Sequence, residues 1–178
     1  MNWLNENKAV GMLSEIMALE RGYTPAKARM IRNAAALHDI GKQKIDGRIL
    51  NKKGKLDPCE FEIMKTHTRL GAEMLAGVKG ELGEAARLCS LMHHEWHDGR
   101  GYWKIPASFL PEYLTFVSIA DVFTALVAER PYKHAWPPEE ALKYIQNQAG
   151  TQFCPELAND FVWLIGHDSR VPAIFAEV

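Results

Sequence analysis

The sequence predicts an all-α fold, with residues 1–178 forming one compact helical domain. Helix starts that contain proline recur along the chain, apolar residues repeat at spacings of three and four, and no long alternating strand pattern is present. The length suits a single domain, and a chain of this size buries roughly 70% of the surface that it exposes when unfolded.

Capping signals mark where the predicted helices begin. Thr24 followed by Pro25 is an N-cap with proline at the first helical position. Asp57 is followed three residues later by Glu60, as in a capping box. Prolines also open the two helices nearest the C-terminus. We expect helices over residues 5–20, 25–37, 57–76, 81–95, 110–129, 137–150 and 155–166.

Two long segments between these helices, residues 42–56 and 96–109, predict loops. The first is rich in glycine, lysine and aspartate, and the second holds Gly99, Gly101 and Pro106. Loops of this length are uncommon inside a domain unless they serve a function, so both are candidates for a functional site.

Composition and charge exclude several classes of protein. A formal net charge of -1 argues against a binder of polymeric nucleic acid, which needs a basic face, but allows a small anionic ligand. The N-terminal residues lack a signal-peptide pattern, and no apolar run approaches the roughly 20 residues of a membrane span. We therefore expect a cytoplasmic protein. Cys59, Cys89 and Cys154 lie far apart, which argues against a disulfide framework or a zinc ribbon.

Several ionisable residues lie among apolar neighbours, where such groups are costly. Asp121, within the apolar run 119–123, would cost several kcal/mol as an unpaired buried carboxylate. The residues that share this setting, in or at the ends of apolar helices, are His38, Asp39, His67, His93, His94 and Asp121.

Each of these residues also has a simpler explanation. A single buried histidine is more often a hydrogen-bonded core residue than a ligand, and a buried aspartate is more often paired with arginine or lysine. Several such groups in one chain favour a shared cation. Adjacent helical residues point about 100° apart, so the pairs 38–39 and 93–94 fit two neighbouring metals better than one. Histidine and carboxylate without cysteine suit iron, manganese or zinc.

The string AALHDIGK at residues 35–42 resembles the motif of the HD superfamily of metal-dependent phosphohydrolases. Further strings follow in the order and at the spacing of its HD-GYP subfamily, so that the resemblance covers residues 6–161. They are MKTH at 64–67, HHE at 93–95, DGRGY at 98–102, ADVFTAL at 120–126, RPYK at 130–133 and GTQF at 150–153.

This resemblance implies a phosphodiesterase that hydrolyses cyclic di-GMP, a bacterial second messenger, to linear pGpG or further to GMP. It also implies two or three divalent metal ions, and we expect iron or manganese. Two metals would lower the pKa of a bridging water to give hydroxide near neutral pH, and would stabilise charge on the phosphate oxygens.

The resemblance assigns roles to individual residues as well. The expected catalytic residues are Asp39 and Lys42, and Lys42 would reach the scissile phosphate. The expected substrate-binding residues are Lys42, Tyr102, Arg130 and Lys133. The expected metal ligands are Glu6, His38, Asp39 and Asp121 for one ion and Asp39, His67, His93 and His94 for the other.

The sequence departs from the family pattern around the expected pocket. Glu6 stands where the family has a histidine, and its other explanation is a first-turn acid favoured by the helix N-terminus. Trp103 replaces the proline of Gly-Tyr-Pro and would either stack on a guanine or cover the loop. Residues 104–109 lack the usual glycines, and Thr124 and Cys154 stand where aspartates are common.

Two other functions stay open at this point. The altered loop could leave a binding module that holds a cyclic dinucleotide, or a protein partner through residues 99–103, without efficient hydrolysis. An HD-family hydrolase acting on another nucleotide is the second alternative. For Arg130 and Lys133, the alternative to ligand contact is a solvated helix end.

Overall fold

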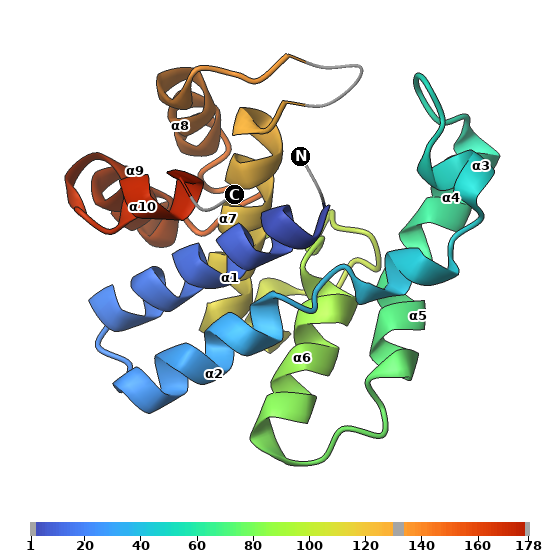
Figure 1. The fold of residues 1–178 in the computed structure, drawn as a ribbon, viewed down its shortest axis with the longest axis horizontal. Helices are drawn as coiled ribbons and strands as arrows, with labels where there is room; N and C mark the ends of the chain where they lie inside the picture. The colour runs from blue at the N-terminus through green and yellow to red at the C-terminus, as the bar shows by residue number, and fades with distance from the viewer. Residues whose placement is uncertain (1–2, 130–133, 177–178) are drawn as a thin grey trace.

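Helices make up the whole regular structure of the computed structural model, which describes residues 3–129 and 134–176 (Figure 1). Within those ranges no strand forms, and Ala149 and Phe153 make an isolated bridge. The predicted all-α fold is confirmed. The elements are α1 (Trp3–Glu20), α2 (Pro25–Ala35), η1 (Ile40–Lys44), α3 (Gly47–Leu50), α4 (Pro58–Lys65), α5 (His67–Met74), α6 (Gly80–Met92), η2 (Ala107–Phe109), α7 (Glu112–Val127), α8 (Pro138–Asn147), α9 (Pro155–His167) and α10 (Val171–Ala176).

The core lies between α1, α2 and α7. Helices α1 and α2 form a hairpin, α7 packs on α1, and α6 packs on α2 (Figure 1). Helix α5 lies against both α6 and η1, while α8 and α9 pack against α7 and against each other. Fully buried side chains such as Leu13, Ile31, Phe116 and Phe161 fill the space between these helices. This arrangement brings the ends of α2, α5 and α6 toward the middle of α7.

The predicted caps are confirmed. The Thr24 side chain accepts a hydrogen bond from the Lys27 backbone N–H at the start of α2. Asp57 and Glu60 form the reciprocal capping box of α4, with distances of 2.9 and 2.8 Å. Each cap satisfies a backbone donor that the first helical turn leaves open.

The helix predicted over residues 57–76 is wrong in one respect, because it is divided into α4 and α5 at Thr66. The Thr66 hydroxyl donates to the Ile63 carbonyl at 2.6 Å, and His67 Nδ1–H donates to the Met64 carbonyl at 2.7 Å. These side chains compete with the backbone for the carbonyls of the preceding turn. His67 therefore begins a new helix, α5.

Other expected boundaries also need correction. The loop predicted over residues 42–56 contains the end of η1 and all of α3, whose first turn is capped by Asp46 accepting from Arg48 N–H at 2.8 Å. Helix α6 ends at Met92, so His93 and His94 lie just beyond it. Helix α10 follows the helix that was expected to be last, and its six residues are too few to give a periodic signal.

The loop over residues 96–109 is irregular apart from η2, as predicted. Its start is tied to a distant turn, because the backbone N–H groups of His97 and Asp98 donate to the carbonyls of Gln152 and Thr151. Across the described ranges, no helix combines the length and the apolar character needed to cross a membrane.

Candidate metal centre

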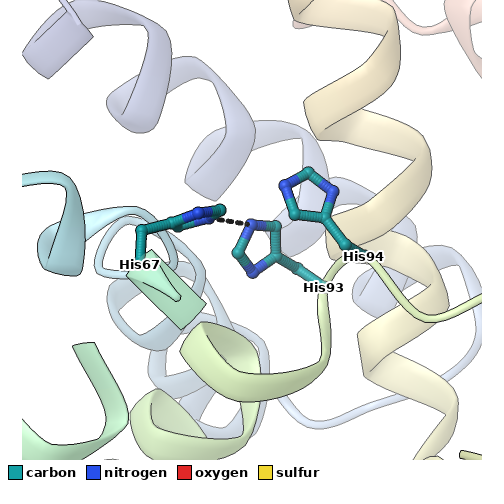
Figure 2. Close-up of side chains that lie close together, drawn as sticks. All are labelled: His67, His93 and His94. Atoms are coloured by element: carbon teal, nitrogen blue, oxygen red, sulfur yellow. Dashed lines mark hydrogen bonds between the residues drawn. The ribbon is translucent and has the colours of Figure 1, made fainter. Parts of the chain in front are cut away.

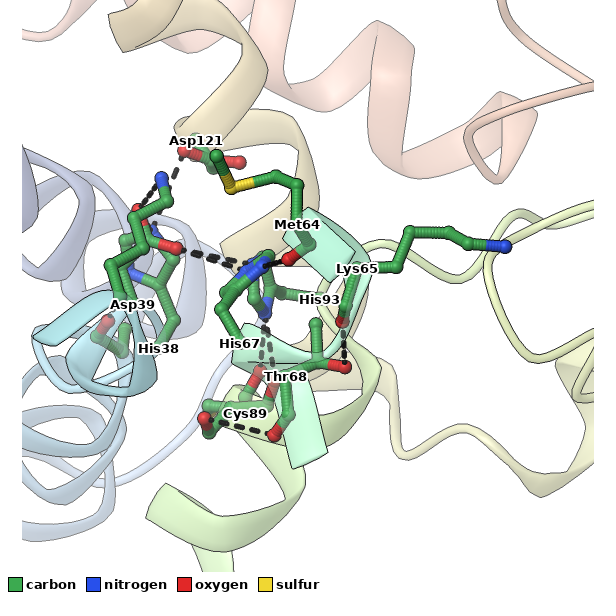
Figure 3. A network of polar contacts seen from close by, with 12 residues as sticks. His38, Asp39, Met64, Lys65, His67, Thr68, Cys89, His93 and Asp121 are labelled. Carbon is green, nitrogen blue, oxygen red and sulfur yellow. Dashed lines mark hydrogen bonds and ion pairs between the residues drawn. The ribbon is translucent and has the colours of Figure 1, made fainter. Parts of the chain in front are cut away.

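Four separate elements bring ionisable side chains to one place in the core. His38 and Asp39 lie between α2 and η1, His67 begins α5, and Asp121 lies in α7 (Figure 3). His93 completes this network from the end of α6. The histidines at positions 38, 67 and 93 are each 1% exposed, and Asp39 is 7% exposed.

A glycine makes this approach possible. A Cβ atom added to Gly41 would lie 1.9 Å from the carbonyl oxygen of His67 and 2.5 Å from the backbone nitrogen of Gly71. Only a residue without a side chain lets η1 come this close to α5. Gly41 thereby holds Asp39 within reach of His67.

Asp39 is the centre of the cluster. Its Oδ1 lies 3.2 Å from Nε2 of His67 and 3.7 Å from Nε2 of His93. Its Oδ2 lies 3.4 Å from Nε2 of His38 and pairs with the amino group of Lys42. Asp121 Oδ1 lies 3.5 Å from the same His38 nitrogen, on the side toward α7. One carboxylate thus faces three imidazoles.

Backbone carbonyls fix the tautomer of three histidines. A carbonyl only accepts, so each Nδ1 must carry the proton that it donates. His38 donates to Ala35 at 2.8 Å, His67 to Met64 at 2.7 Å, and His93 to Cys89 at 2.9 Å. In the neutral rings, every Nε2 is then an unprotonated lone pair that points into the cluster, as in histidines that bind metals.

Among the described residues, these Nε2 atoms face one another and the carboxylates of Asp39 and Asp121. Nε2 of His67 and Nε2 of His93 lie 3.4 Å apart (Figure 2). In the described part of the chain, His38 Nε2 and Asp39 Oδ1 are buried atoms without a hydrogen-bond partner. A cation would satisfy all of them at once, because imidazole nitrogen and carboxylate oxygen are common metal donors. The residues therefore fit a metal centre.

Within the described ranges, the ligand atoms gather in two groups that share His93. One comprises His67, His93 and His94, and the other comprises His38, Asp39 and His93, with the atoms of each group within 4.8 Å of one another. Figure 2 shows the rings of the first group lying side by side between α5 and the end of α6. Two adjacent groups with donors of this kind could hold two divalent ions.

Burial and charge together set the protonation of the cluster. Burial lowers the pKa of His94 to about 4, even though Asp121 raises it, so this imidazole is neutral at neutral pH. Burial raises the pKa of Asp39, but His38 and Lys42 outweigh this effect and hold it well below its usual value. Burial also lowers the pKa of His38, but Asp39 and Asp121 outweigh it and raise that pKa to about 10. A cation at this site would compete with the His38 proton.

The structure places the remaining predicted site residues as follows. Lys42 lies beside Asp39, and the Tyr102 ring lies 4.4 Å from the His94 ring. Glu6 lies in the first turn of α1, and neither group of gathered ligand atoms found among the described residues includes it. Arg130 and Lys133 lie outside the described residues.

Two residues of the site have roles that the sequence did not predict. Glu95 is 3% exposed, and its carboxylate accepts the backbone N–H groups of Trp103 at 2.7 Å and Ile105 at 2.9 Å. Trp103 lies against α5, with the guanidinium carbon of Arg69 3.6 Å from the centre of its ring. For Glu95 the only signal in the sequence was that it directly follows the two histidines, whereas Trp103 stood out as a departure from the family pattern.

A model of the HD domain family matches residues 2–157. The chain is 40% identical over 141 residues to the cyclic di-GMP phosphodiesterase response regulator RpfG of Xanthomonas campestris, covering 79% of this chain and 37% of that protein. It is 39% identical over 149 residues to the 3'3'-cGAMP-specific phosphodiesterase 2 of Vibrio cholerae, covering 83% of this chain and 28% of that protein. This chain therefore spans well under half of either relative.

A solved structure has a similar fold. It is Bd1817, an HDG"Y"P protein from Bdellovibrio bacteriovorus, which superposes with a TM-score of 0.75 over 93% of this chain and 53% of that one. The identity is 18%, so this likeness supports the fold alone.

Proposed function

Because this chain belongs to the HD domain family, we propose that it is a metal-dependent phosphodiesterase that hydrolyses cyclic di-GMP. Its membership agrees with the motifs of the sequence, from the HD pair at residues 38 and 39 to the Gly-Tyr pair at 101 and 102. The proposal takes residues 1–178 as one catalytic domain. A relative with 40% identity bears the name of a cyclic di-GMP phosphodiesterase.

One observation carries this proposal. The Nε2 atoms of His38, His67 and His93 surround the carboxylate of Asp39 in a buried site, where, among the described residues, His38 Nε2 and Asp39 Oδ1 have no hydrogen-bond partner. A structural core would not accumulate such costly groups, whereas a metal centre requires them.

We propose that one ion is held by His38, Asp39 and Asp121, and the other by Asp39, His67, His93 and His94. Glu6 remains a proposed additional ligand of the first ion. Bound divalent ions would supply Lewis acidity toward a phosphate and lower the pKa of water. Histidine and carboxylate donors without cysteine suit iron, manganese or zinc, and the family resemblance leads us to propose iron or manganese.

The other residues of the site would bind and orient the substrate. The Lys42 ammonium, 34% exposed beside Asp39, can donate a charge-assisted hydrogen bond to a phosphate oxygen at the mouth of the cluster. The Tyr102 ring next to His94 offers an aromatic surface at the same place, and burial raises the pKa of its hydroxyl to about 12. The tyrosine therefore stays a neutral hydrogen-bond donor. Roles for Arg130 and Lys133 in binding the dinucleotide remain part of the proposal.

A second candidate is hydrolysis of 3'3'-cGAMP. The relative that bears this name is nearly as similar as the first, at 39% against 40% identity. Both candidates need the same metal centre and differ in the nucleobase that the pocket accepts. A protein partner bound through residues 99–103 remains a prediction.

Product analysis on a panel of substrates tests the proposal. The protein would be loaded with Fe2+ or Mn2+ under reducing conditions and incubated with cyclic di-GMP, 3'3'-cGAMP and cyclic di-AMP at equal concentrations. We expect cyclic di-GMP to be cleaved fastest, giving linear pGpG or GMP. Faster cleavage of 3'3'-cGAMP would move the assignment to the second candidate. Binding of cyclic di-GMP without any product would instead indicate a receptor.

A further inference from the structure

His94 is held differently from the other histidines of the cluster. The rings of His38, His67 and His93 are each oriented by a hydrogen bond from Nδ1 to a backbone carbonyl. Among the described residues, the His94 ring makes no hydrogen bond of this kind. Its neighbours are rings: His93 at 4.0 Å and Tyr102 at 4.4 Å between centroids, the latter with the two planes tilted by 37°. Tyr102 is thus the group that faces His94 from the loop.

The loop that carries Tyr102 is anchored on one side by Glu95. The N–H groups of Trp103 and Ile105 both point at the Glu95 carboxylate, and Lys104 between them has a φ of +57°. Successive N–H groups around a left-handed residue form a concave site for an anion, and here the anion is a side chain of the same protein. This contact fixes the backbone directly after Tyr102.

The Trp103 side chain makes the second anchor. Its Nε1–H donates at 2.9 Å to Oγ1 of Thr68, which is fully buried one residue after His67. The Thr68 hydroxyl in turn donates to the Lys65 carbonyl at 2.9 Å. The Arg69 guanidinium stacks on the indole ring. Trp103 therefore ties the loop to the start of α5, the same turn that presents His67.

From these contacts we propose that Trp103 is a positioning residue of the metal centre. Held by Thr68 and Glu95, it keeps the Tyr102 ring against His94. It thereby orients a proposed metal ligand whose ring donates to no backbone carbonyl of the described residues. The sequence has tryptophan where the HD-GYP subfamily that it resembles has proline. The contacts of Trp103 with Thr68 and Glu95, which we call the clamp, therefore take the place of a stiff backbone. This inference rests on the proposed metal centre but not on the identity of the substrate.

Calorimetric titration of the chelator-treated protein with Mn2+ tests the inference without measuring turnover. Trp103→Phe removes the indole N–H and keeps an aromatic ring, while Thr68→Val removes the acceptor. Each should weaken binding of one Mn2+ ion about tenfold, the range found when a group that orients a metal ligand is removed. The double variant should bind Mn2+ no more weakly than either single variant, because the two substitutions remove the same hydrogen bond. Tyr102→Leu should show the same loss.

Two control variants and one further measurement accompany the titration. Thr68→Ser keeps the hydroxyl and should bind Mn2+ as the unaltered protein does. Trp163→Phe makes the same substitution at an exposed tryptophan of α9 and should have no effect. Trypsin should cleave after the exposed Lys104 faster in Trp103→Phe and Thr68→Val than in the unaltered protein, because their loop is released.

The possible outcomes separate this inference from the proposed function. Unchanged Mn2+ affinity in folded Trp103→Phe or Thr68→Val would overturn the role of Trp103. Should Trp103→Phe fail to fold, Thr68→Val alone decides the question. The expected affinity pattern in a protein that cleaves no cyclic dinucleotide would support the clamp and contradict the proposed function. An unaltered protein that binds no Mn2+ would overturn both.

Discussion

Nε2 of His67 and Nε2 of His93 lie 3.4 Å apart, although both imidazoles already donate their Nδ1 proton to a backbone carbonyl. Two neutral rings of this tautomer direct lone pairs at each other and repel. Both nitrogens also face Asp39 Oδ1, a buried acceptor that lacks a hydrogen-bond partner in the described structure. The repulsion disappears if a cation lies among these atoms. Metal binding and folding should therefore be coupled.

Metal removal should lower the thermal stability of the protein. Mn2+ at one hundred times its dissociation constant stabilises a folded protein by about 2.7 kcal/mol. For a chain of this size, that corresponds to a rise in Tm of about 5–10 °C. The measurement is thermal unfolding with Mn2+ and with excess EDTA. The matched control is Asp39→Asn, which keeps the shape of the side chain and removes its charge. A Tm that responds equally to Mn2+ in both proteins would contradict the site.

Gly41→Ala should destabilise the protein by about 3 kcal/mol or more. The new methyl group would meet the His67 carbonyl oxygen at 1.9 Å, and backbone atoms cannot move away as a flexible side chain can. The measurement is urea unfolding followed by circular dichroism. Gly77→Ala is the matched control, since a Cβ there has nothing within 4 Å and should change stability by well under 1 kcal/mol. Equal stability of the two variants would show that η1 and α5 are not this close.

Lys104→Gly should stabilise the protein by up to about 1 kcal/mol. Lys104 has a φ of +57°, which costs a residue with a Cβ roughly 1–2 kcal/mol and glycine almost nothing. Part of this gain is lost to the greater entropy of glycine in the unfolded chain. Lys55→Gly, at an exposed loop lysine, should be neutral or slightly destabilising. A loss of stability in Lys104→Gly would indicate that the loop does not hold a left-handed residue here.

Acid should destabilise the metal-depleted protein, partly through His94. Burial lowers the pKa of His94 to about 4 in the folded protein, against about 6.5 in an unfolded chain. Between these values the unfolded chain binds a proton that the folded protein does not, so stability falls as the pH drops from 6.5 toward 4. Urea unfolding at pH 7 and pH 5, with EDTA present, measures the fall. In His94→Gln it should be smaller by on the order of 1 kcal/mol. An equal fall in both proteins would show that His94 is not buried as a neutral ring.

Local signals in the sequence predicted most of the helices, because caps and apolar spacing act within a few residues. Thr24 and the Asp57–Glu60 box mark helix starts by contacts that span three residues. The break at Thr66 and the approach of Gly41 to His67 depend on contacts between elements, so periodicity could not reveal them. Polar residues in apolar helices identified the histidines and aspartates of the site because burial makes such residues costly.

The loop around Trp103 was harder to predict for the same physical reason. Trp103 bonds to Thr68, 35 residues earlier, and a preference for stacking on a nucleobase was an equally reasonable expectation. In the sequence, Glu95 resembles a solvated residue at a helix end. In the structure, its carboxylate accepts hydrogen bonds from the backbone N–H groups of Trp103 and Ile105. Contacts between residues that only folding brings together cannot be predicted from the types of those residues.

We propose that the cluster around Asp39 holds the ions that carry out hydrolysis. The most direct test measures bound metal and product together in the unaltered protein and in Asp39→Asn, each loaded with Fe2+ or Mn2+ and supplied with cyclic di-GMP. We expect about two ions per chain and metal-dependent release of pGpG or GMP from the unaltered protein. Folded Asp39→Asn should lose both the bound metal and the product. Undiminished product formation by Asp39→Asn would contradict it.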